Sequence, residues 1–182
     1  MKTNIVLVVI GLMMLCAAAS AAAVTVSVDS TTVGAGSKAT IPVNIKGANS
    51  LGAMDFIVTY DSVVLTFSKG ELGEASPNGM VSFNDKNPGS VKVSLADSKG
   101  ISTDGAMVKL TFDVTGAKGT KTAMGVNVIG AWNEDLTDVQ TTTQDGTVTV
   151  GDVKKAPVSA VMVLLGVLVA GMLVMYQRSR NH

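Results

Sequence analysis

Residues 52–65 read Gly-Ala-Met-Asp-Phe-Ile-Val-Thr-Tyr-Asp-Ser-Val-Val-Leu, the most informative segment of the chain. It contains two strand-like runs joined by a tight turn at Asp61-Ser62. Side chains alternate between the two faces of a strand, so the first run has one heavy face and one light face. The heavy set is Met54, Phe56, Val58 and Tyr60, and the light set is Ala53, Asp55, Ile57 and Thr59. We therefore expect a strand that buries its heavy face and directs Asp55 outward.

The sequence on both sides of this stretch has the same character. Short alternating runs are separated by clusters of Gly, Ser, Asn and Asp at intervals of roughly ten residues, as in all-β sandwiches. No segment has convincing helical periodicity. Nine strands in two packed sheets are predicted near residues 24–28, 39–46, 52–60, 63–67, 80–84, 90–96, 106–114, 122–129 and 146–150. The large aromatic residues are expected in the core, and Trp132 is expected to pack in the core or against a loop.

Both ends of the chain are apolar. Residues 1–23 combine Lys2, an apolar run and an Ala-rich stretch, the layout of a cleaved secretory signal peptide. Residues 157–176 carry no charge and have the length of a transmembrane helix. The expected organisation is a signal peptide (1–23), a domain (24–150), a short linker (151–156), a membrane helix (157–176) and a cytoplasmic tail (177–182). This order predicts a single-pass protein of the cell membrane with its domain outside.

Charge and cysteine content restrict the domain further. All 14 acidic residues lie between Asp29 and Asp152, together with only nine lysines, so the domain is acidic. Nucleic acid is therefore an unfavourable partner, because it rewards clustered cations. The single cysteine, Cys16, would leave with the signal peptide, so no disulfide is expected in the mature chain.

Few residues are available for catalysis. The single histidine is His182, the last residue, so the common Ser/His/Asp, Cys/His and zinc arrangements are not expected in the domain. A glycosidase-like carboxylate pair needs only two acids, but Glu71, Glu74 and Glu134 are predicted in loops, where solvation explains them. The cluster Asn133-Glu134-Asp135-x-x-Asp138 does not fit an EF-hand calcium loop, so a solvated acidic loop is the preferred interpretation.

Five motifs follow one another over nearly the whole domain. They are Val33-Gly34-Ala35-Gly36 leading into Ile41-Pro42-Val43; Asp55-Phe56 with Tyr60-Asp61-x-x-Val64-Leu65; Val91-x-Val-x-Leu95-Ala96-Asp97-Ser98-Lys99-Gly100-Ile101; Gly105-x-Met-x-x-Leu110-x-Phe112-x-Val114; and Asp145-Gly146-Thr147-Val148. In this order they resemble the cohesin domain, the receptor for dockerin modules in complexes that degrade polysaccharides.

The resemblance implies a nine-stranded jelly-roll sandwich, related to carbohydrate-binding modules, that binds a helical dockerin on one flat sheet face. Asp55 matches the family's hydrogen-bond acceptor, and Asp97 and Gly100 match the acidic and glycine members of a later loop. Ser94 would share the face by parity, as would Ile57 and Ala53. Many type I cohesins have Asn where this chain has Ala53. No cofactor is expected on this chain, because the calcium of such a pair belongs to the dockerin.

The leading hypothesis is a non-catalytic, membrane-tethered cohesin module at the cell surface. It would bind a dockerin-bearing protein linked to polysaccharide binding or degradation. One alternative is a carbohydrate-binding domain of the same fold with polysaccharide as its partner. A second is a structural or adhesive surface domain, and an enzyme is the least favoured.

Overall fold

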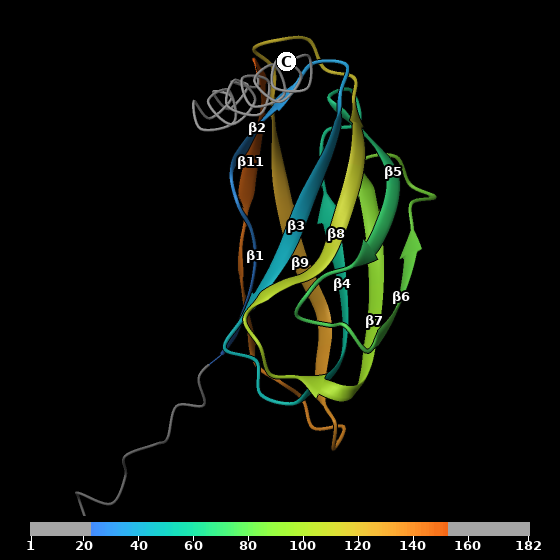
Figure 1. Cartoon of the computed structure of the whole chain (residues 1–182), viewed down its shortest axis with the longest axis vertical. Helices are drawn as coiled ribbons and strands as arrows, with labels where there is room; N and C mark the ends of the chain where they lie inside the picture. The colour runs from blue at the N-terminus through green and yellow to red at the C-terminus, as the bar shows by residue number, and fades with distance from the viewer. Residues whose placement is uncertain (1–22, 153–182) are drawn as a thin grey trace, which may run out of the picture.

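The computed structural model describes residues 23–152, which form two β-sheets packed face to face (Figure 1). Between these limits there are eleven strands. Their bounds are β1 Val24–Val28, β2 Thr31–Gly34, β3 Lys38–Lys46, β4 Leu51–Thr59, β5 Leu65–Leu72, β6 Gly79–Asn84, β7 Ser90–Ile101, β8 Gly105–Val114, β9 Lys121–Asn133, β10 Thr141–Gln144 and β11 Gly146–Gly151.

The two sheets differ in size and in the strands they use. The five-stranded sheet has the order β10-β1-β3-β8-β5, and the six-stranded sheet has the order β2-β11-β9-β4-β7-β6. In Figure 1 strands β3 and β8 lie in front of β9 and β4. This arrangement is the all-β sandwich expected from the alternating runs.

The core lies between the sheets and is built from the inward side chains of both. In β4 the heavy face is buried, with Met54, Phe56 and Val58 fully inaccessible, as the alternation predicted. Phe112 of β8 is also fully buried, and the Tyr60 ring meets it edge to face with centroids 4.9 Å apart. Burying one such side chain contributes about 1.5–3 kcal/mol, so this layer of large residues stabilises the contact between the sheets.

The turn after β4 carries the chain from one sheet to the other. It runs from Asp61 to Val64: the Asp61 carbonyl accepts hydrogen bonds from the amides of Val64 and Leu65, both at 3.0 Å, and its carboxylate accepts one from Val63 at 2.8 Å. Strand β5 follows in the five-stranded sheet. The two runs of residues 52–65 are therefore not paired with each other but belong to different sheets.

The strand count differs from the nine expected, because β2 and β10 were not predicted. Each has only four residues, two of them exposed in β2 and three in β10, so neither shows an apolar alternation. Both are held by parallel pairing, β2 with β11 and β10 with β1. Three strands also run further than predicted: β5 reaches Leu72, β7 reaches Ile101 and β9 reaches Asn133. Glu71 consequently lies in a strand and not in a loop.

The segments predicted at the two ends fall largely outside the described residues. This applies to the signal peptide (1–23) apart from Ala23, to residues 153–156 of the linker, and to the membrane helix (157–176) and the tail (177–182). Gly151, assigned to the linker, is the last residue of β11. Within residues 23–152 there is no helix with the length and apolar character needed to cross a membrane.

Candidate binding face

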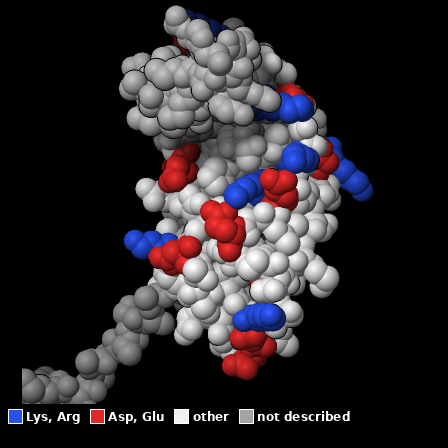
Figure 2. Space-filling view, viewed as in Figure 1, with Lys and Arg blue, Asp and Glu red and all other residues white. Residues whose placement is uncertain are grey.

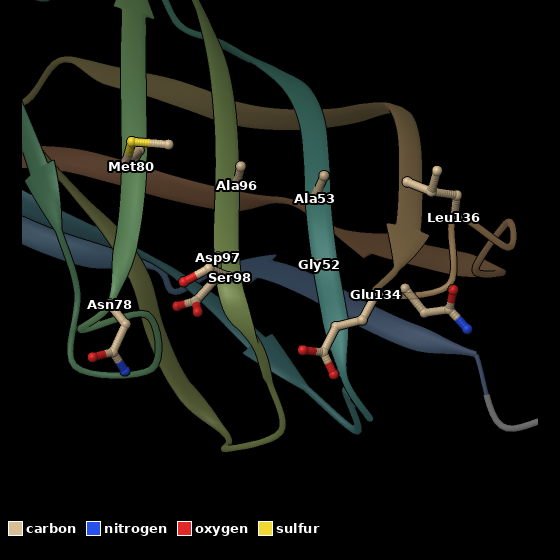
Figure 3. Close-up of a pocket in the computed structure, with 10 residues that line it drawn as sticks. Gly52, Ala53, Asn78, Met80, Ala96, Asp97, Ser98, Glu134 and Leu136 are labelled. Carbon is tan, nitrogen blue, oxygen red and sulfur yellow. The ribbon is translucent and has the colours of Figure 1, made fainter.

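The outer face of the six-stranded sheet carries a row of apolar side chains across four adjacent strands. Met80 of β6 is opposite Ala96 of β7, Ala96 is opposite Ala53 of β4, and Ala53 is opposite Trp132 of β9. We call these four residues the apolar row. Met80 is 77% exposed, although most of the other large apolar side chains are buried. In Figure 3 Met80, Ala96 and Ala53 project to the same side of the sheet.

A polar row lies beside the apolar row, two residues away along each of the same four strands. It consists of Ser82, Ser94, Asp55 and Gly130, which follow the same register across β6, β7, β4 and β9. Asp55 points outward as predicted, and its carboxylate forms an ion pair with Lys92 at 3.3 Å. A third row contains Asn84, Lys92, Ile57 and Asn127. The structure thus brings four predicted site residues onto one face: Ala53, Asp55, Ile57 and Ser94.

Trp132 was expected in the core or against a loop, and the core half of that expectation is wrong, because Trp132 belongs to this outer face and not to the core cluster. Its side chain is partly buried because the indole lies over Gly130. A Cβ atom at Gly130 would stand 2.3 Å from Cη2 of the indole, so only glycine leaves room for this arrangement. The backbone of Trp132 is also bridged to Asp138 beyond the following turn. The ring therefore extends the apolar row on the sheet surface.

Two shallow depressions lie along the rows. The first, about 550 Å³, lies at the end of the apolar row, and its lining includes Met80, Ala96, Ala53, Glu134 and Leu136 (Figure 3). The second, about 410 Å³, joins the apolar row to Asp55, Ser82 and Ser94. Depressions of this size on a sheet face accept protruding side chains of a partner, whereas a small-molecule site is usually more enclosed.

Leu136 stands at the rim of the first depression and is 82% exposed. Its φ of 59° lies in the left-handed region, which is unfavourable for a leucine. The turn holds it there: the Asn133 side chain accepts hydrogen bonds from the amides of Asp135 at 3.0 Å and Thr137 at 2.8 Å. The Asn133 carbonyl accepts a third from Leu136 at 3.0 Å. A large apolar side chain is therefore held in water by a well-bonded turn.

The structure does not place Asp97 and Gly100 beside Asp55 on the outer face. Both lie inside β7, which continues past Ala96, and not in a loop. Asp97 follows the inward parity of Val93 and Leu95, is 5% exposed and accepts a hydrogen bond from the Lys99 amide at 2.9 Å. It still contributes to the lining of the first depression. Its position in the resemblance motif could not reveal this burial, because the strand was expected to end before it.

Gly100 has a structural reason for being glycine. Its φ is +64°, and a Cβ there would stand 2.8 Å from the Ser50 Cα and 2.9 Å from the Glu134 carboxyl group. It therefore lets the end of β7 pass closely under the loop before β4 and the turn after β9.

Several residues of this face were not selected from the sequence. Met80 and Ala96 were placed in or beside predicted strands, but their neighbours on the sheet depend on the register between strands, which one sequence does not reveal. Leu136 was hidden in a segment that reads as an acidic loop. Lys92 lies at an outward position of β7, and its ion pair with Asp55 follows only from the pairing of β4 with β7.

The outer face of the five-stranded sheet has a different chemistry. Ion pairs join Lys38 to Asp113 at 2.7 Å, Lys69 to Glu71 at 3.0 Å and Lys109 to Glu74 at 2.8 Å. Figure 2 shows charged side chains of both signs side by side over this view of the molecule. The hydrogen bond from Lys109 lowers the pKa of Glu74, and the same contact raises the pKa of Lys109.

Three of the residues considered for catalysis or calcium already have partners. Glu71 and Glu74 are each paired with a lysine, and the side chain of Asn133 is occupied by its own turn. Among residues 23–152, no three His, Cys, Asp or Glu side chains come together in a way that could hold a metal ion.

One outer face of the sandwich is rich in charges, whereas the other is flat, carries few charges and presents small and apolar side chains. This contrast indicates a class of binding module whose contact surface is a sheet. Comparison with protein families agrees with this class. The cohesin domain model matches residues 24–150, and the chain belongs to the cohesin domain family. Cohesin domains are non-catalytic binding modules, so the chain is not an enzyme.

Solved structures support the assignment. The non-cellulosomal cohesin from the hyperthermophilic archaeon Archaeoglobus fulgidus is 27% identical, with 72% of this chain and 93% of that chain covered and a TM-score of 0.66. The sixth cohesin of Acetivibrio cellulolyticus scaffoldin B, solved in complex with a mutant Cel5 dockerin, is 26% identical, with 71% and 99% covered and a TM-score of 0.64.

A type I cohesin–dockerin complex from Clostridium thermocellum shares 16% identity, with 71% of this chain and 99% of that chain covered. Its TM-score of 0.66 shows the shared fold alone. Comparison with curated proteins finds no match.

Proposed function

We propose that this chain is a cohesin module that binds a dockerin-bearing protein through the outer face of β9, β4, β7 and β6. The observation that carries the proposal is the apolar row beside Asp55: Met80, Ala96, Ala53 and Trp132 offer a flat strip next to a hydrogen-bond acceptor. Helical partners commonly bury an apolar stripe, and a small number of polar contacts fixes their position. The Acetivibrio relative at 26% identity, solved with a dockerin, supports the same partner class.

We also propose where the module is located in the cell and what kind of protein it holds there. Residues 157–176 have the composition of a membrane-spanning helix, and residues 1–23 have that of a signal peptide, which supports a single-pass protein with the domain outside the cell. Tethered in this way, the module would hold its partner at the cell surface. A partner that acts on polysaccharide fits the family context, and calcium would belong to the partner.

A binding assay tests the partner class. The immobilised full chain is incubated with dockerin-bearing proteins from the same organism in calcium buffer, and in parallel with EGTA. Retention in calcium and release in EGTA support the proposal, whereas no retention of any such protein contradicts it. Protease treatment of intact cells tests the location, since an outside domain is digested while a cytoplasmic marker survives.

One observation favours a second candidate, direct binding of a carbohydrate. The Trp132 ring lies on the sheet surface and is only partly buried, beside a depression of about 340 Å³ that is also lined by Asp138 and Gln140. An exposed aromatic ring with polar neighbours suits the face of a sugar ring. A glycan array probed with the wild type and with Trp132→Ala distinguishes the candidates, because sugar binding requires hits that the substitution removes.

A further inference from the structure

The ion pair between Asp55 and Lys92 occupies the centre of the face proposed for partner binding. Asp55 lies opposite Ser94, and Lys92 precedes Ser94 by two residues on the same strand, so the pair runs diagonally from β4 to β7. Its Nζ–Oδ2 distance is 3.3 Å, and the side chains remain 45% exposed for Lys92 and 31% exposed for Asp55. Both groups can therefore reach a partner that settles on the sheet.

These two are the only charged residues in the three rows described above. The remaining members are apolar residues, serine, asparagine and glycine: Met80, Ala96, Ala53, Trp132, Ser82, Ser94, Gly130, Asn84, Ile57 and Asn127. Two acidic residues line the first depression, Glu134 and the buried Asp97. The electrostatic character of the centre of the face is thus set by one pair.

The ion pair with Lys92 changes which groups of a partner Asp55 can bind. An unpaired carboxylate on a sheet face would favour a lysine or arginine of the partner, but Lys92 already supplies that charge. When a partner displaces water, Lys92 needs acceptors for the ammonium hydrogens that do not face Asp55, because hydrogen-bond donors left without acceptors in an interface are unfavourable. Asp55 keeps lone pairs that can accept from a hydroxyl or an amide. A second cation near Lys92 would be repelled.

We infer that Lys92 determines specificity at this face by selecting a partner helix that carries a carboxylate over Lys92 and a hydroxyl or amide over Asp55. The same arrangement rejects a partner with lysine or arginine at this point. The inference rests on the proposed function, since it describes the partner of the same face.

The test uses a displayed library built on the Cel5 dockerin of Acetivibrio cellulolyticus, with the helix residues that face outward randomised. The library is selected in calcium buffer on the immobilised full chain as wild type, Lys92→Ala and Lys38→Ala. Lys38 is the matched control because it forms the Lys38–Asp113 ion pair on the opposite sheet. Sequencing gives the ratio of acidic to basic residues at each randomised position, and calorimetry gives affinities for representative binders.

On the wild type and on Lys38→Ala we expect at least one position to be enriched in Asp or Glu and depleted of Lys and Arg. On Lys92→Ala that preference should disappear or reverse, with the affinity ratio of an acidic to a basic binder falling by about tenfold or more, the size expected for one close charge pair. The same ratio on Lys92→Ala and on the wild type overturns the inference while leaving the proposed function intact. Failure of every library member to bind the wild type in calcium overturns both.

Discussion

The six-membered ring of the Trp132 indole lies against Gly130, two residues earlier on β9, so closely that a Cβ at Gly130 would stand 2.3 Å from Cη2 and 2.7 Å from Cζ2. This contact holds an aromatic ring on the sheet surface, beside the depression that Asp138 and Gln140 also line. Gly130 lies opposite Asp55, and because glycine has no side chain, the indole can occupy the space over it. The glycine thus sets the position of the largest side chain in the apolar row.

Gly130→Ala tests this contact. In a strand, alanine is usually about 0.5–1 kcal/mol more stable than glycine, but here the new Cβ displaces the indole and offsets that gain. In a Trp132→Ala background the same change should be stabilising by about 0.5–1 kcal/mol, giving a coupling near 1 kcal/mol in a double-mutant cycle. Urea unfolding measures the free energies, and Trp132 fluorescence should shift to the red in Gly130→Ala. Additive effects of the two substitutions would show that the contact is absent in solution.

Asp55→Ala should weaken dockerin binding by about 1–3 kcal/mol, because a polar group of the partner loses its acceptor in a desolvated interface. Isothermal titration calorimetry with any dockerin that the wild type retains gives the value. Asp113→Ala is the control, since it removes a lysine-paired carboxylate from the opposite sheet and should leave affinity unchanged. Equal affinities for wild type and Asp55→Ala would remove Asp55 from the interface.

Leu136→Gly separates the stability of the turn from its role in binding. Glycine adopts φ near +59° without the penalty that leucine incurs, so unfolding free energy should stay constant or rise by up to about 1 kcal/mol. Affinity for the dockerin should fall by about 1–3 kcal/mol, as for an apolar anchor at an interface. Thermal melts and calorimetry on one sample give both values. A variant that binds normally would show that the exposed leucine lies outside the contact.

Gly100→Ala should destabilise the domain more than Gly36→Ala does. Both glycines have positive φ, +64° and +69°, so both substitutions carry the backbone penalty of about 1–2 kcal/mol. Only Gly100 adds a steric conflict with Ser50 and Glu134, because a Cβ at Gly36 would meet no heavy atom of residues 23–152 within 4 Å. Denaturant midpoints compare the two variants. Equal losses of stability would contradict the close approach seen at Gly100.

The Lys109–Glu74 pair predicts a pH effect on the five-stranded sheet. The pKa of Glu74 lies below its ordinary value of 4.5 in the folded chain, mainly because Lys109 donates a hydrogen bond to its carboxylate. A depressed carboxyl pKa contributes stability above that ordinary value, and the contribution is lost as pH falls through the folded pKa. NMR titration of the Glu74 side chain should show the low pKa, and Lys109→Gln should raise it. An unchanged pKa in Lys109→Gln would exclude the pair in solution.

The sequence predicted the parts of the fold that depend on alternation. Met54, Phe56 and Val58 are buried and Asp55 points outward, because strand parity needs only local spacing. Strands β2 and β10 were not predicted, because backbone pairing with β11 and β1 holds them and their short sequences show no apolar alternation.

The binding face was only partly predictable for the same reason. Ala53, Asp55, Ile57 and Ser94 share a face by parity on β4 and β7, but their neighbours follow from register. Asp97 was expected after the end of a strand and is buried within one, because β7 continues to Ile101. The exposure of the Leu136 side chain depends on its left-handed backbone conformation, which the composition of the turn does not predict.

The apolar row takes one residue from each of four strands, and next to each of them on its strand a side chain packs in or against the core, namely Val81, Leu95, Met54 and Ala131. A point substitution in the row therefore alters the surface while the register and the buried residues beside it stay in place. An insertion in any of the four strands would instead reverse the facing of that strand and break the row. Such a surface can acquire a new partner through successive single replacements, whereas changes in strand length would be removed by selection for folding.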